Sequence, residues 1–561
     1  MQVFTLSTTS YSGRPATKKG VLKLGKERQK IALLSVYDKR GIVEFARWLV
    51  NVRGYIIWSS GGTAKKIREA GIPVTDTAEI THHGALLDHR VATLWGRIHG
   101  GLMAKFNPKH TAEMRKLHWD YVDLVCVDVY PLEEAIAMGK TWDEIIDMID
   151  IGGPTMLSSG AKGERISLCE QSQRASYMAW EDAGRPNEQA QIRYWNAKAD
   201  AYVATYRLTS ARYRGPFEGI IGEKVSDCCY DENKRSGACL YTTGSDDPLA
   251  LGRFVKAEES MMDPSYVNWC DMHSALTTLC HATDAFRRAG ITPFMAFGVK
   301  HGNACGAGYA TTSEQALKNM IVGDRKAILG GMVITNFVFE EKHAEILLHW
   351  RNLPGEKRRL IDCLAVPAIT PGAIALMERR KGKCRVMINP ALDSPAVTME
   401  TDKQIRPVRG GFLMQDPMPL IVDPLSDPEY LICGKITARQ LRDGLFAWAI
   451  ASTSVSNTFT LVKNGRLIGN GCGRQSRVDA CRLAIQLAVQ NGHDTANSTG
   501  WSDSYFPKDD GPRLLVKAGV KTIFTTSGSQ SDEQIFAYFQ SQPGLTVVAI
   551  PDKIARGFCR H

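Results

Sequence analysis

Apolar and polar positions follow two different periods from residue 31 onward. Residues 31–36 (Ile-Ala-Leu-Leu-Ser-Val) form an apolar run of strand length, and residues 55–58 (Tyr-Ile-Ile-Trp) form another. Gly54 is suited to end a helix because glycine readily adopts the left-handed conformation found there. Between the two runs, apolar side chains recur at the spacing of one buried helix face, at Ile42, Phe45, Ala46, Leu49 and Val50. This stretch therefore predicts a strand, a helix and a second strand.

The same alternation continues through the first half of the chain. A helix is predicted over residues 64–70 and a buried strand over residues 121–127. Repeated strand–helix alternation indicates an α/β fold with a parallel sheet covered by helices on both faces. Ligands of such sheets bind at the carboxyl ends of the strands. Residues that follow the predicted strands are therefore the first candidates for a site.

A change in composition marks a domain boundary. Tyr, Arg and Gly crowd together over residues 205–245 and the apolar period is lost, so we place the boundary near residue 215. Strands are predicted again over residues 326–334 and 458–462. A chain of 561 residues is too long for a single core. The predicted organisation is an N-terminal extension over residues 1–30, a first domain over residues 31–215 and a second part over residues 216–561.

The composition is that of a globular protein, with 44% hydrophobic and 23% charged residues. The net charge of +10 is spread along the chain, and a basic cluster such as Arg379-Arg380-Lys381 is only three residues long. A diffuse basic excess suits anionic ligands. Because aromatic and basic residues are not interleaved as in single-strand-binding segments, small phosphorylated or carboxylated substrates are favoured over nucleic acid.

Cysteine usage and hydropathy bear on the compartment. The 14 cysteines include no CxxC pair, which indicates reduced thiols in a cytoplasmic protein. No apolar run approaches the ~20 residues that span a bilayer, so no membrane partner is expected. Residues 1–26 contain neither Asp nor Glu, are rich in Ser and Thr, and lack the hydrophobic region of a secretory signal. A flexible tail is expected there, with an organellar transit peptide as the alternative.

The first candidate site is the turn Ser60-Gly61-Gly62-Thr63, between a predicted strand and a predicted helix. Glycines let the backbone approach an anion, and the free N–H groups of a helix N-terminus then bind it. Lys39, just after the first strand, could reach the same anion. The alternatives are a tight turn with a capping hydroxyl and a solvated surface lysine.

A second candidate combines Asp150, Gly152 and Gly153 with Lys162 further along the chain. A carboxylate and a lysine near a glycine turn can position an amide and polarise a carbonyl. The alternative is a surface ion pair.

A third candidate is Lys300-His301, in a glycine-rich turn. The histidine can take a proton near neutral pH and the lysine can stabilise negative charge. Cys305 nearby is a weaker nucleophile candidate, because no oriented Cys/His pair can be recognised. Alternate glycines over residues 469–473 allow close approach of a ligand or of another backbone. Arg477 begins the predicted helix that follows, where it could bind an anion or pair on the surface.

Together and in this order, these segments resemble the bifunctional AICAR transformylase/IMP cyclohydrolase family, from about residue 31 to the C-terminus. The matching pieces are Ser-Val-Tyr-Asp-Lys39, Ser60-Gly-Gly-Thr-Ala-Lys65, Gly71-Ile-Pro-Val-Thr75, Arg90-Val-Ala-Thr93, Ile98-His99-Gly-Gly101, Tyr130-Pro131, Ile149-Asp-Ile-Gly-Gly-Pro-Thr155, Tyr266-Val-Asn268-Trp-Cys-Asp271, Lys300-His301, Gly330-Gly331, Ser456-Asn457, Gly473-Arg-Gln-Ser-Arg477, Asp503-Ser-Tyr-Phe506-Pro507, Ser527-Gly-Ser529 and Arg556-Gly-Phe558.

The resemblance implies a particular architecture. The first domain is expected to have a methylglyoxal-synthase-like α/β fold with a parallel sheet. The second part is expected to consist of two cytidine-deaminase-like α/β subdomains without a zinc-ligand set, so no metal is expected. The family also implies a homodimer with transformylase sites at the subunit interface.

The resemblance also implies formyl transfer in the second part. The amine of AICAR (aminoimidazole carboxamide ribonucleotide) attacks the formyl group of 10-formyltetrahydrofolate, the folate co-substrate. His301 is expected to relay the amine proton and Lys300 to stabilise the oxyanion. Asn457 completes the expected catalytic set. Substrate contacts are expected from Asn268, Asp271, Arg477, Phe506 and Arg556.

The first domain is expected to close the ring of formyl-AICAR to IMP with loss of water. Holding the two reacting ends together is most of that task, because closure is intramolecular. Tyr130, Asp150 and Lys162 are expected to act at the ring-closing atoms, next to Gly152 and Gly153. The phosphate side is expected to be held by Lys39, Ser60, Gly61, Gly62, Thr63, Arg90 and Thr93.

The sequence departs from the family at several of these positions. Ala92 stands where a lysine is usual, Tyr37 where a serine is usual, and Cys229 where an arginine would bind phosphate. Lys234 or Arg235 could replace that arginine. Further departures are Trp95, Ser158, Val366 and the run Ser452-Thr-Ser454. The alternatives are therefore an enzyme that has lost one activity or uses a related ribonucleotide, and a non-catalytic nucleotide-binding homologue.

Overall fold

The computed structural model describes residues 28–87, 90–234, 237–393, 399–417 and 428–560. The described chain divides into two compact units, the first ending at Ile221 and the second beginning at Gly222. Most of the predicted N-terminal extension, residues 1–27, lies outside the described residues. Arg235, a candidate phosphate ligand, also lies outside them.

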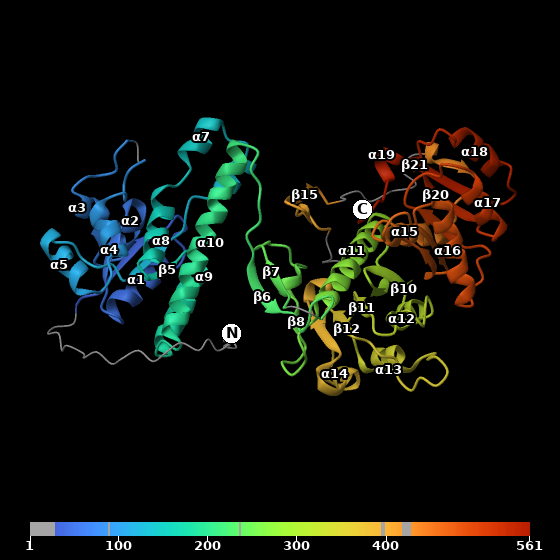
Figure 1. Cartoon of the computed structure of the whole chain (residues 1–561), viewed down its shortest axis with the longest axis horizontal. Helices are drawn as coiled ribbons and strands as arrows, with labels where there is room; N and C mark the ends of the chain where they lie inside the picture. Colours follow the sequence, from blue (N-terminus) through green and yellow to red (C-terminus); the bar gives the residue numbers. More distant parts are fainter. Residues whose placement is uncertain (1–27, 88–89, 235–236, 394–398, 418–427, 561) are drawn as a thin grey trace. The chain divides into compact units, whose positions relative to one another are not determined.

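The first unit contains a five-stranded sheet, and every strand pair in it is parallel (Figure 1). Its order is β3-β2-β1-β4-β5. The three central strands are almost entirely buried, as expected of a sheet covered on both faces. This confirms the predicted α/β class and parallel sheet. The strands are β1 (Ile31–Ser35), β2 (Ile56–Ser59), β3 (Thr75–Asp76), β4 (Leu124–Val127) and β5 (Ile166–Leu168).

Helices cover both faces of this sheet. Helices α1 (Ile42–Asn51) and α9 (Gln171–Asp182) contribute to one hydrophobic cluster, and helices α4 (Gly96–Met103) and α8 (Gly152–Lys162) contribute to another. The long helix α10 (Glu188–Arg214) supplies residues to both (Figure 1). Helix α10 continues to Arg214, past residue 205, although the apolar period is lost there.

The strand order predicts a ligand-binding crevice at the carboxyl ends of the two central strands, β1 and β4. From β1 the chain proceeds to β2 and β3 on one side, and from β4 it proceeds to β5 on the other. Successive strands are therefore added in opposite directions on the two sides of the β1–β4 pair, although the strands themselves are parallel. Ligands of parallel sheets bind outside the carboxyl ends of strands at such a point, which here means the residues just after Ser35 and Val127.

The second unit contains a twelve-stranded mixed sheet with order β16-β21-β20-β19-β17-β18-β10-β9-β11-β12-β13-β8. The first six strands in chain order are β8 (Val255–Lys256), β9 (Phe294–Lys300), β10 (Asn303–Ala310), β11 (Met332–Thr335), β12 (Cys363–Val366) and β13 (Arg385–Ile388). The other six are β16 (Leu431–Cys433), β17 (Phe459–Lys463), β18 (Arg466–Gly471), β19 (Thr499–Ser502), β20 (Thr522–Ser527) and β21 (Thr546–Pro551).

This sheet is built from two copies of one arrangement. In each half a long helix leads into an antiparallel hairpin, β9–β10 or β17–β18, followed by three mutually neighbouring strands that alternate with helices. In each half a short antiparallel strand, β8 or β16, closes the outer edge. The halves join where the equivalent strands β10 and β18 pair antiparallel. The order and pairing of the strands thus repeat in the two halves, which we call the two subdomains.

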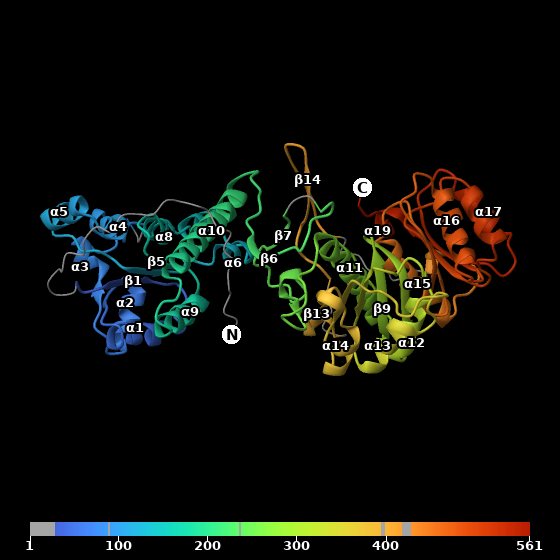
Figure 2. The same cartoon turned by 60° about the horizontal axis from the view of Figure 1, so that its bottom comes forward.

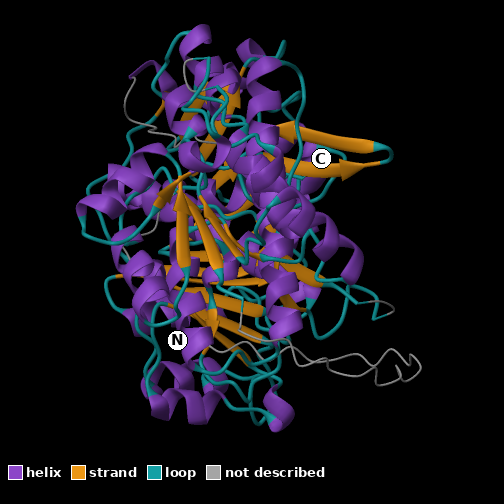
Figure 3. Ribbon diagram, turned by 90° about the vertical axis from the view of Figure 1, so that its left-hand side faces the viewer, coloured by secondary structure: helices purple, strands orange, loops and turns teal. Residues whose placement is uncertain are grey.

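The helices of the second unit pack on both faces of its sheet. Figure 3 shows the whole chain coloured by secondary structure, with helices on either side of the strands. One layer consists of α11 (Tyr266–Arg288) and α15 (Ala438–Ala451), which pack on each other and on one face. The other helices pack on the opposite face, and they are α12 (Ser313–Ile321), α13 (Glu341–His349), α14 (Pro371–Met377), α16 (Arg477–Gln490), α17 (Asp510–Lys517) and α18 (Asp532–Gln540). The strand predicted over residues 326–334 begins only at Met332, because the chain turns at Gly330 with φ of 73°.

A two-stranded hairpin of β14 (Gln404–Val408) and β15 (Gly411–Gln415) stands out from the second unit (Figure 2). Its cross-strand pairs place Ile405 opposite Met414 and Pro407 opposite Phe412. Alternate residues of a strand share a face, so one face of the hairpin is entirely apolar. The side chains of Phe412 and Met414 are exposed.

Candidate active sites

The carboxyl ends of β1 and β4 are joined by one carboxylate. Asp128 follows β4, and its Oδ1 accepts hydrogen bonds from the backbone N–H groups of Tyr37 and Asp38 after β1. Its Oδ2 accepts from Arg174 at 2.9 Å. Burial raises the pKa of Asp128, while these donors oppose the shift. The Asp128–Arg174 pair therefore fixes the backbone at the predicted crevice.

The glycine turn lies beside this crevice at the start of α2 (Gly61–Glu69). Ser60 is the N-cap residue of α2 but its side chain makes no capping hydrogen bond, and its Oγ lies 2.6 Å from the Oγ of Ser35. Gly61 has a φ of 41°, which other residues rarely adopt. Because the first N–H groups of a helix lack intrahelical partners, Gly61 and Gly62 present donors suited to an anion.

Two further predicted phosphate ligands lie at the same turn. The hydroxyl of Thr63 accepts from Val36 N at 3.1 Å and donates to Val36 O at 3.0 Å, so it joins α2 to β1. Lys39 Nζ donates to the carbonyls of Val36 and Tyr37. Its Cε lies 3.9 Å from where a Cβ on Gly62 would sit. Burial lowers the pKa of Lys39, and the carboxylate of Asp128 opposes this effect.

Asp150 and two glycines lie together at the N-terminus of α8. Asp150 Oδ1 accepts from Gly153 N at 2.9 Å, and the backbone N–H of Asp150 donates to Tyr206 Oη at 2.8 Å. A Cβ on Gly152 would lie 2.6 Å from Thr93 Oγ1, and one on Gly153 would lie 2.6 Å from Asp150 Oδ2. Burial raises the pKa of Asp150. The sequence needs glycine here because Thr93 and Asp150 occupy the space.

Other predicted residues of this site are distributed unevenly. Tyr130 lies near Asp150. Burial is the main cause that raises the pKa of the Tyr130 phenol, and the negative charge of Asp150 adds to the shift. Arg90 forms an ion pair with Asp147. Lys162 is exposed at the far end of α8, about 15 Å from its beginning because a helix rises 1.5 Å per residue. Within one chain the structure does not bring Lys162 to Asp150.

In the second unit, His301 and Gly302 form the turn between β9 and β10, with φ of 51° and 75°. Asp271 Oδ1 on α11 accepts from Gly302 N at 2.7 Å. Gly302 O accepts from Arg560 Nη1 at 2.6 Å, and the same guanidinium bonds Ser274. The His301 side chain itself is exposed. A buried carboxylate and the C-terminal segment therefore hold the turn while leaving the imidazole accessible.

The second subdomain has the same turn with different residues. Asn464 and Gly465 connect β17 and β18 with φ of 52° and 74°, and Asp443 on α15 accepts from both backbone N–H groups. Asn-Gly is the sequence that such a left-handed turn prefers. The first subdomain has a histidine in the equivalent place, so the two turns share a backbone conformation and only the turn of the first subdomain carries an imidazole.

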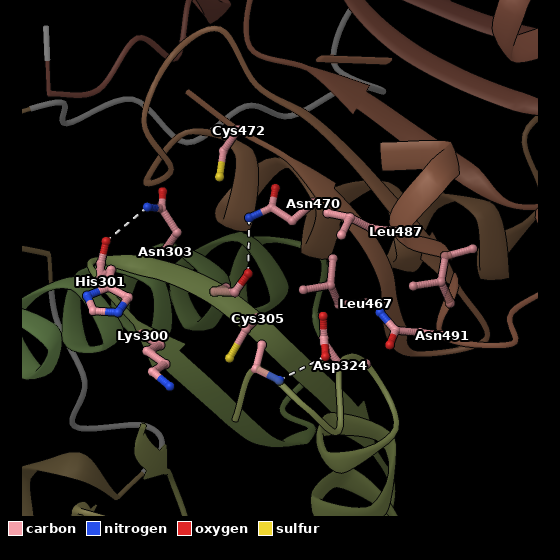
Figure 4. A pocket seen from close by; sticks show the side chains of 15 residues that line it. Lys300, His301, Asn303, Cys305, Asp324, Leu467, Asn470, Cys472, Leu487 and Asn491 are labelled. Carbon is pink, nitrogen blue, oxygen red and sulfur yellow. Dashed lines mark hydrogen bonds between the residues drawn. The ribbon is translucent and has the colours of Figure 1, made fainter. Parts of the chain in front are cut away.

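Lys300 and His301 border a cavity of about 320 Å³ between the two subdomains (Figure 4). Lys300 Nζ donates to Leu329 O at 2.7 Å. Residues of β10 and β18 and of the segments after α12 and α16 line the rest, including Asp324. Burial raises the pKa of the Cys305 thiol in this lining to about 12, which disfavours the nucleophile considered from the sequence.

Asn457 lies on a loop tied to the His301 turn. Asn303 Nδ2 donates to His301 O at 3.0 Å, and Asn303 Oδ1 accepts from Val455 N at 3.0 Å. Asn457 Oδ1 accepts from Arg477 Nη2 at 2.8 Å. Asn303 thus ties the loop that carries Asn457 to the His301 turn, and Arg477 holds the Asn457 amide in place.

Several predicted substrate contacts have other partners here. Arg477 is buried against Asp503, and burial lowers its pKa to about 10. Asn268 Oδ1 accepts from Ser265 N in the cap of α11. Phe506 lies in the hydrophobic core of the second subdomain. Arg556 forms an ion pair with Asp552 and lies over the ring of Phe558.

Sequence reasoning missed some residues of both sites. Asn303 lies two residues after His301. Nothing in the sequence shows that its side chain links the His301 turn to the loop at Val455. Asp128, Arg174 and Arg560 act through partners that are distant in sequence. Cys229 stands where the family has a phosphate-binding arginine, and its thiol accepts a hydrogen bond from Arg385 Nη2 at 3.2 Å.

Among the described residues, no group of three or more His, Cys, Asp or Glu side chains is arranged to hold a metal ion. No helix in the described ranges is both long and apolar enough to cross a membrane.

Comparison with known proteins gives matches over both units. The model of the family described as AICARFT/IMPCHase bienzyme matches residues 184–487, and that of the MGS-like domain matches residues 41–155. Three similar proteins are called bifunctional purine biosynthesis protein PurH. The Acaryochloris marina protein is 31% identical over 90% of this chain and 95% of its own length. The Acidithiobacillus ferrooxidans protein is 32% identical (90% and 95%), and the Deinococcus deserti protein 29% identical (91% and 96%).

Proposed function

The chain belongs to the AICARFT/IMPCHase bienzyme family, and from this premise we propose that it catalyses the last two steps of IMP synthesis. The second unit transfers a formyl group from 10-formyltetrahydrofolate to AICAR. The first unit closes formyl-AICAR to IMP and releases water. The observation that carries the proposal is the exposed His301 on a turn held by Asp271 and Asn303, in a chain that matches the family over both units.

Formyl transfer requires a base for the amine and a donor for the oxyanion. His301 takes the proton as the AICAR amine attacks the formyl carbon, and then returns it to the leaving folate nitrogen. Lys300, on the same turn, stabilises the tetrahedral oxyanion, a contribution of typically about 3 kcal/mol for one donor. Asn457 orients the amine from the neighbouring loop.

Ring closure requires the two ends of formyl-AICAR to meet. The N–H groups of Gly61 and Gly62, with Lys39, hold the phosphate. Beside the start of α8, Asp150 accepts the proton of the attacking carboxamide nitrogen, and Tyr130 protonates the developing oxyanion to a hydroxyl. Asp150 then gives its proton to that hydroxyl, which leaves as water, while the former formamide nitrogen gives its proton to the Tyr130 phenolate as the ring double bond forms. Holding the ends close accounts for most of the rate enhancement, because the reaction is intramolecular.

The proposal includes a cytoplasmic homodimer with transformylase sites at the subunit interface. The apolar face of the β14–β15 hairpin supports it, since an isolated two-stranded hairpin is marginally stable in water and exposes Phe412 and Met414. Folate, AICAR, formyl-AICAR and IMP are the expected ligands.

One assay tests the function. Purified protein is given AICAR and 10-formyltetrahydrofolate, and tetrahydrofolate and IMP are followed separately. Joint appearance of both products is expected. Accumulation of formyl-AICAR would favour the second candidate, an enzyme with formyl transfer alone, which the alanine at position 92 supports. Absence of both products would overturn the proposal and favour a nucleotide-binding homologue.

A further inference from the structure

Two aromatic side chains meet at the crevice of the first unit. Tyr37 follows β1 and Tyr130 follows β4, so they lie at the point where the strand order reverses. Their ring centroids are 5.5 Å apart and the rings are inclined at 74°. Tyr37 is 51% exposed and Tyr130 45% exposed. Each ring therefore keeps a free surface in a place where ligands of such sheets bind.

The backbone that carries Tyr37 is fixed. Its N–H and that of Asp38 both donate to Asp128 Oδ1, whose other oxygen accepts from Arg174. The side chains of Asp128 and Arg174 are only 14% and 5% exposed. A ring on so constrained a segment loses little conformational entropy when a ligand packs against it.

The aromatic pair is close to both polar groups of the proposed site, the glycine turn with Lys39 and the segment of Asp150. Lys39, two residues after Tyr37, approaches Gly62 at the anion-binding turn. Tyr130 lies next to Asp150. A ligand that places its phosphate at the turn and its reacting atoms at Asp150 can pack its ring system on Tyr37 and Tyr130.

We propose that Tyr37 is a specificity-determining residue that stacks on the heterocycle of a purine ribonucleoside monophosphate, with Tyr130 as the adjoining wall. This inference rests on the proposed cyclohydrolase function. Ring closure converts an imidazole with two flexible arms into a flat bicyclic purine, which presents a larger π surface. Stacking on Tyr37 therefore stabilises the closed ring more than the open one. This stacking adds to the affinity for the nucleotide in a chain that has alanine at position 92 instead of the usual lysine.

The test compares the full-length protein with Tyr37→Ser and Tyr37→Phe. The inhibition constant of IMP against cyclization of supplied formyl-AICAR reports on this site alone. Ribose 5-phosphate, which lacks a base, is the second inhibitor. Tyr37→Ser is expected to raise the IMP constant about tenfold, within the range of base–aromatic stacking. Tyr37→Phe keeps the ring and should stay within twofold, and the ribose 5-phosphate constant should be the same in all three proteins.

Three results would overturn the stacking role. They are an unchanged IMP constant in Tyr37→Ser, an equal rise for ribose 5-phosphate, and an equal rise in Tyr37→Phe. If the unmodified protein does not cyclize formyl-AICAR, the proposed cyclohydrolase function fails. Direct titration of IMP into the same three proteins then decides the stacking separately, since equal affinities contradict it and a selective loss in Tyr37→Ser supports it.

Discussion

At the residue scale, His301 combines an unfavourable backbone with an accessible imidazole. Its φ of 51° matches that of Asn464 in the equivalent turn of the second subdomain. Asparagine tolerates this conformation better than histidine does, because its short side chain can bond locally. The histidine thus costs stability at a position where its imidazole is exposed beside Lys300.

This leads to a prediction for His301→Asn. Formyl transfer should fall by about 10²–10⁴, the usual contribution of a general base, while the free energy of unfolding should be unchanged or rise by about 1 kcal/mol. Tetrahydrofolate release and thermal unfolding measure the two effects. The matched control is Asn464→His, which should lose stability and keep turnover. Retained transfer in His301→Asn would exclude the proton relay.

Asp150 predicts the pH dependence of cyclization. Burial raises its folded pKa above its ordinary value, so it binds a proton at a higher pH than the ~3.9 of an exposed aspartate. As a base it is active only when ionised. Activity is therefore expected above the raised pKa and is lost as pH falls through it. The profile of kcat/KM for formyl-AICAR should show an acid limb clearly above pH ~4, and a flat profile down to that pH would contradict the role. Asp150→Asn should lack cyclization at every pH.

At the scale of elements, the start of α8 shapes the proposed cyclohydrolase site. A methyl group on Gly153 would lie 2.6 Å from Asp150 Oδ2 and 3.1 Å from Val127 Cγ1. Gly153→Ala should therefore displace Asp150, cost about 1–3 kcal/mol as overpacking does, and reduce cyclization while formyl transfer persists. Gly84→Ala is the control, because no atom lies within 4 Å of the Cβ position there. Normal cyclization by Gly153→Ala, measured on supplied formyl-AICAR, would argue against the assigned geometry.

The β14–β15 hairpin gives a second prediction at this scale. If its apolar face packs against a second copy, Phe412→Glu should shift the protein toward monomer, because a buried unpaired carboxylate is costly. Gln415→Glu adds the same charge on the other face of the hairpin and should leave the dimer intact. Sedimentation velocity measures the mass. Equal behaviour of the two variants would remove the hairpin from the interface.

At the scale of the whole molecule, the proposed function assigns a separate site to each of the two units. His301→Ala should abolish tetrahydrofolate release but still cyclize supplied formyl-AICAR, and Asp150→Asn should do the reverse. A mixture of the two variants should form IMP from AICAR, because the intermediate released by one is the substrate of the other. If the mixture forms no IMP although each variant retains its remaining step, the intermediate does not pass freely through solution.

The sequence by itself determined the elements and the general positions of the sites. Periodicity depends on neighbours a few residues apart, so β1, α1, β2 and the glycine turn could be predicted. Motif order was enough to indicate the family and the residues Lys300, His301 and Asp150. The α/β class followed from alternation alone.

Only the tertiary structure decided which of these groups share a site. Arg477 and Phe506 are buried, and Lys162 lies at the far end of α8 from Asp150, which local patterns do not reveal. The pairing of β10 with β18 and the bonds of Asp128 join segments that are far apart in the chain. Such contacts depend on how whole elements pack. A periodic pattern shows which face of an element is buried, but not which distant side chain lies against it.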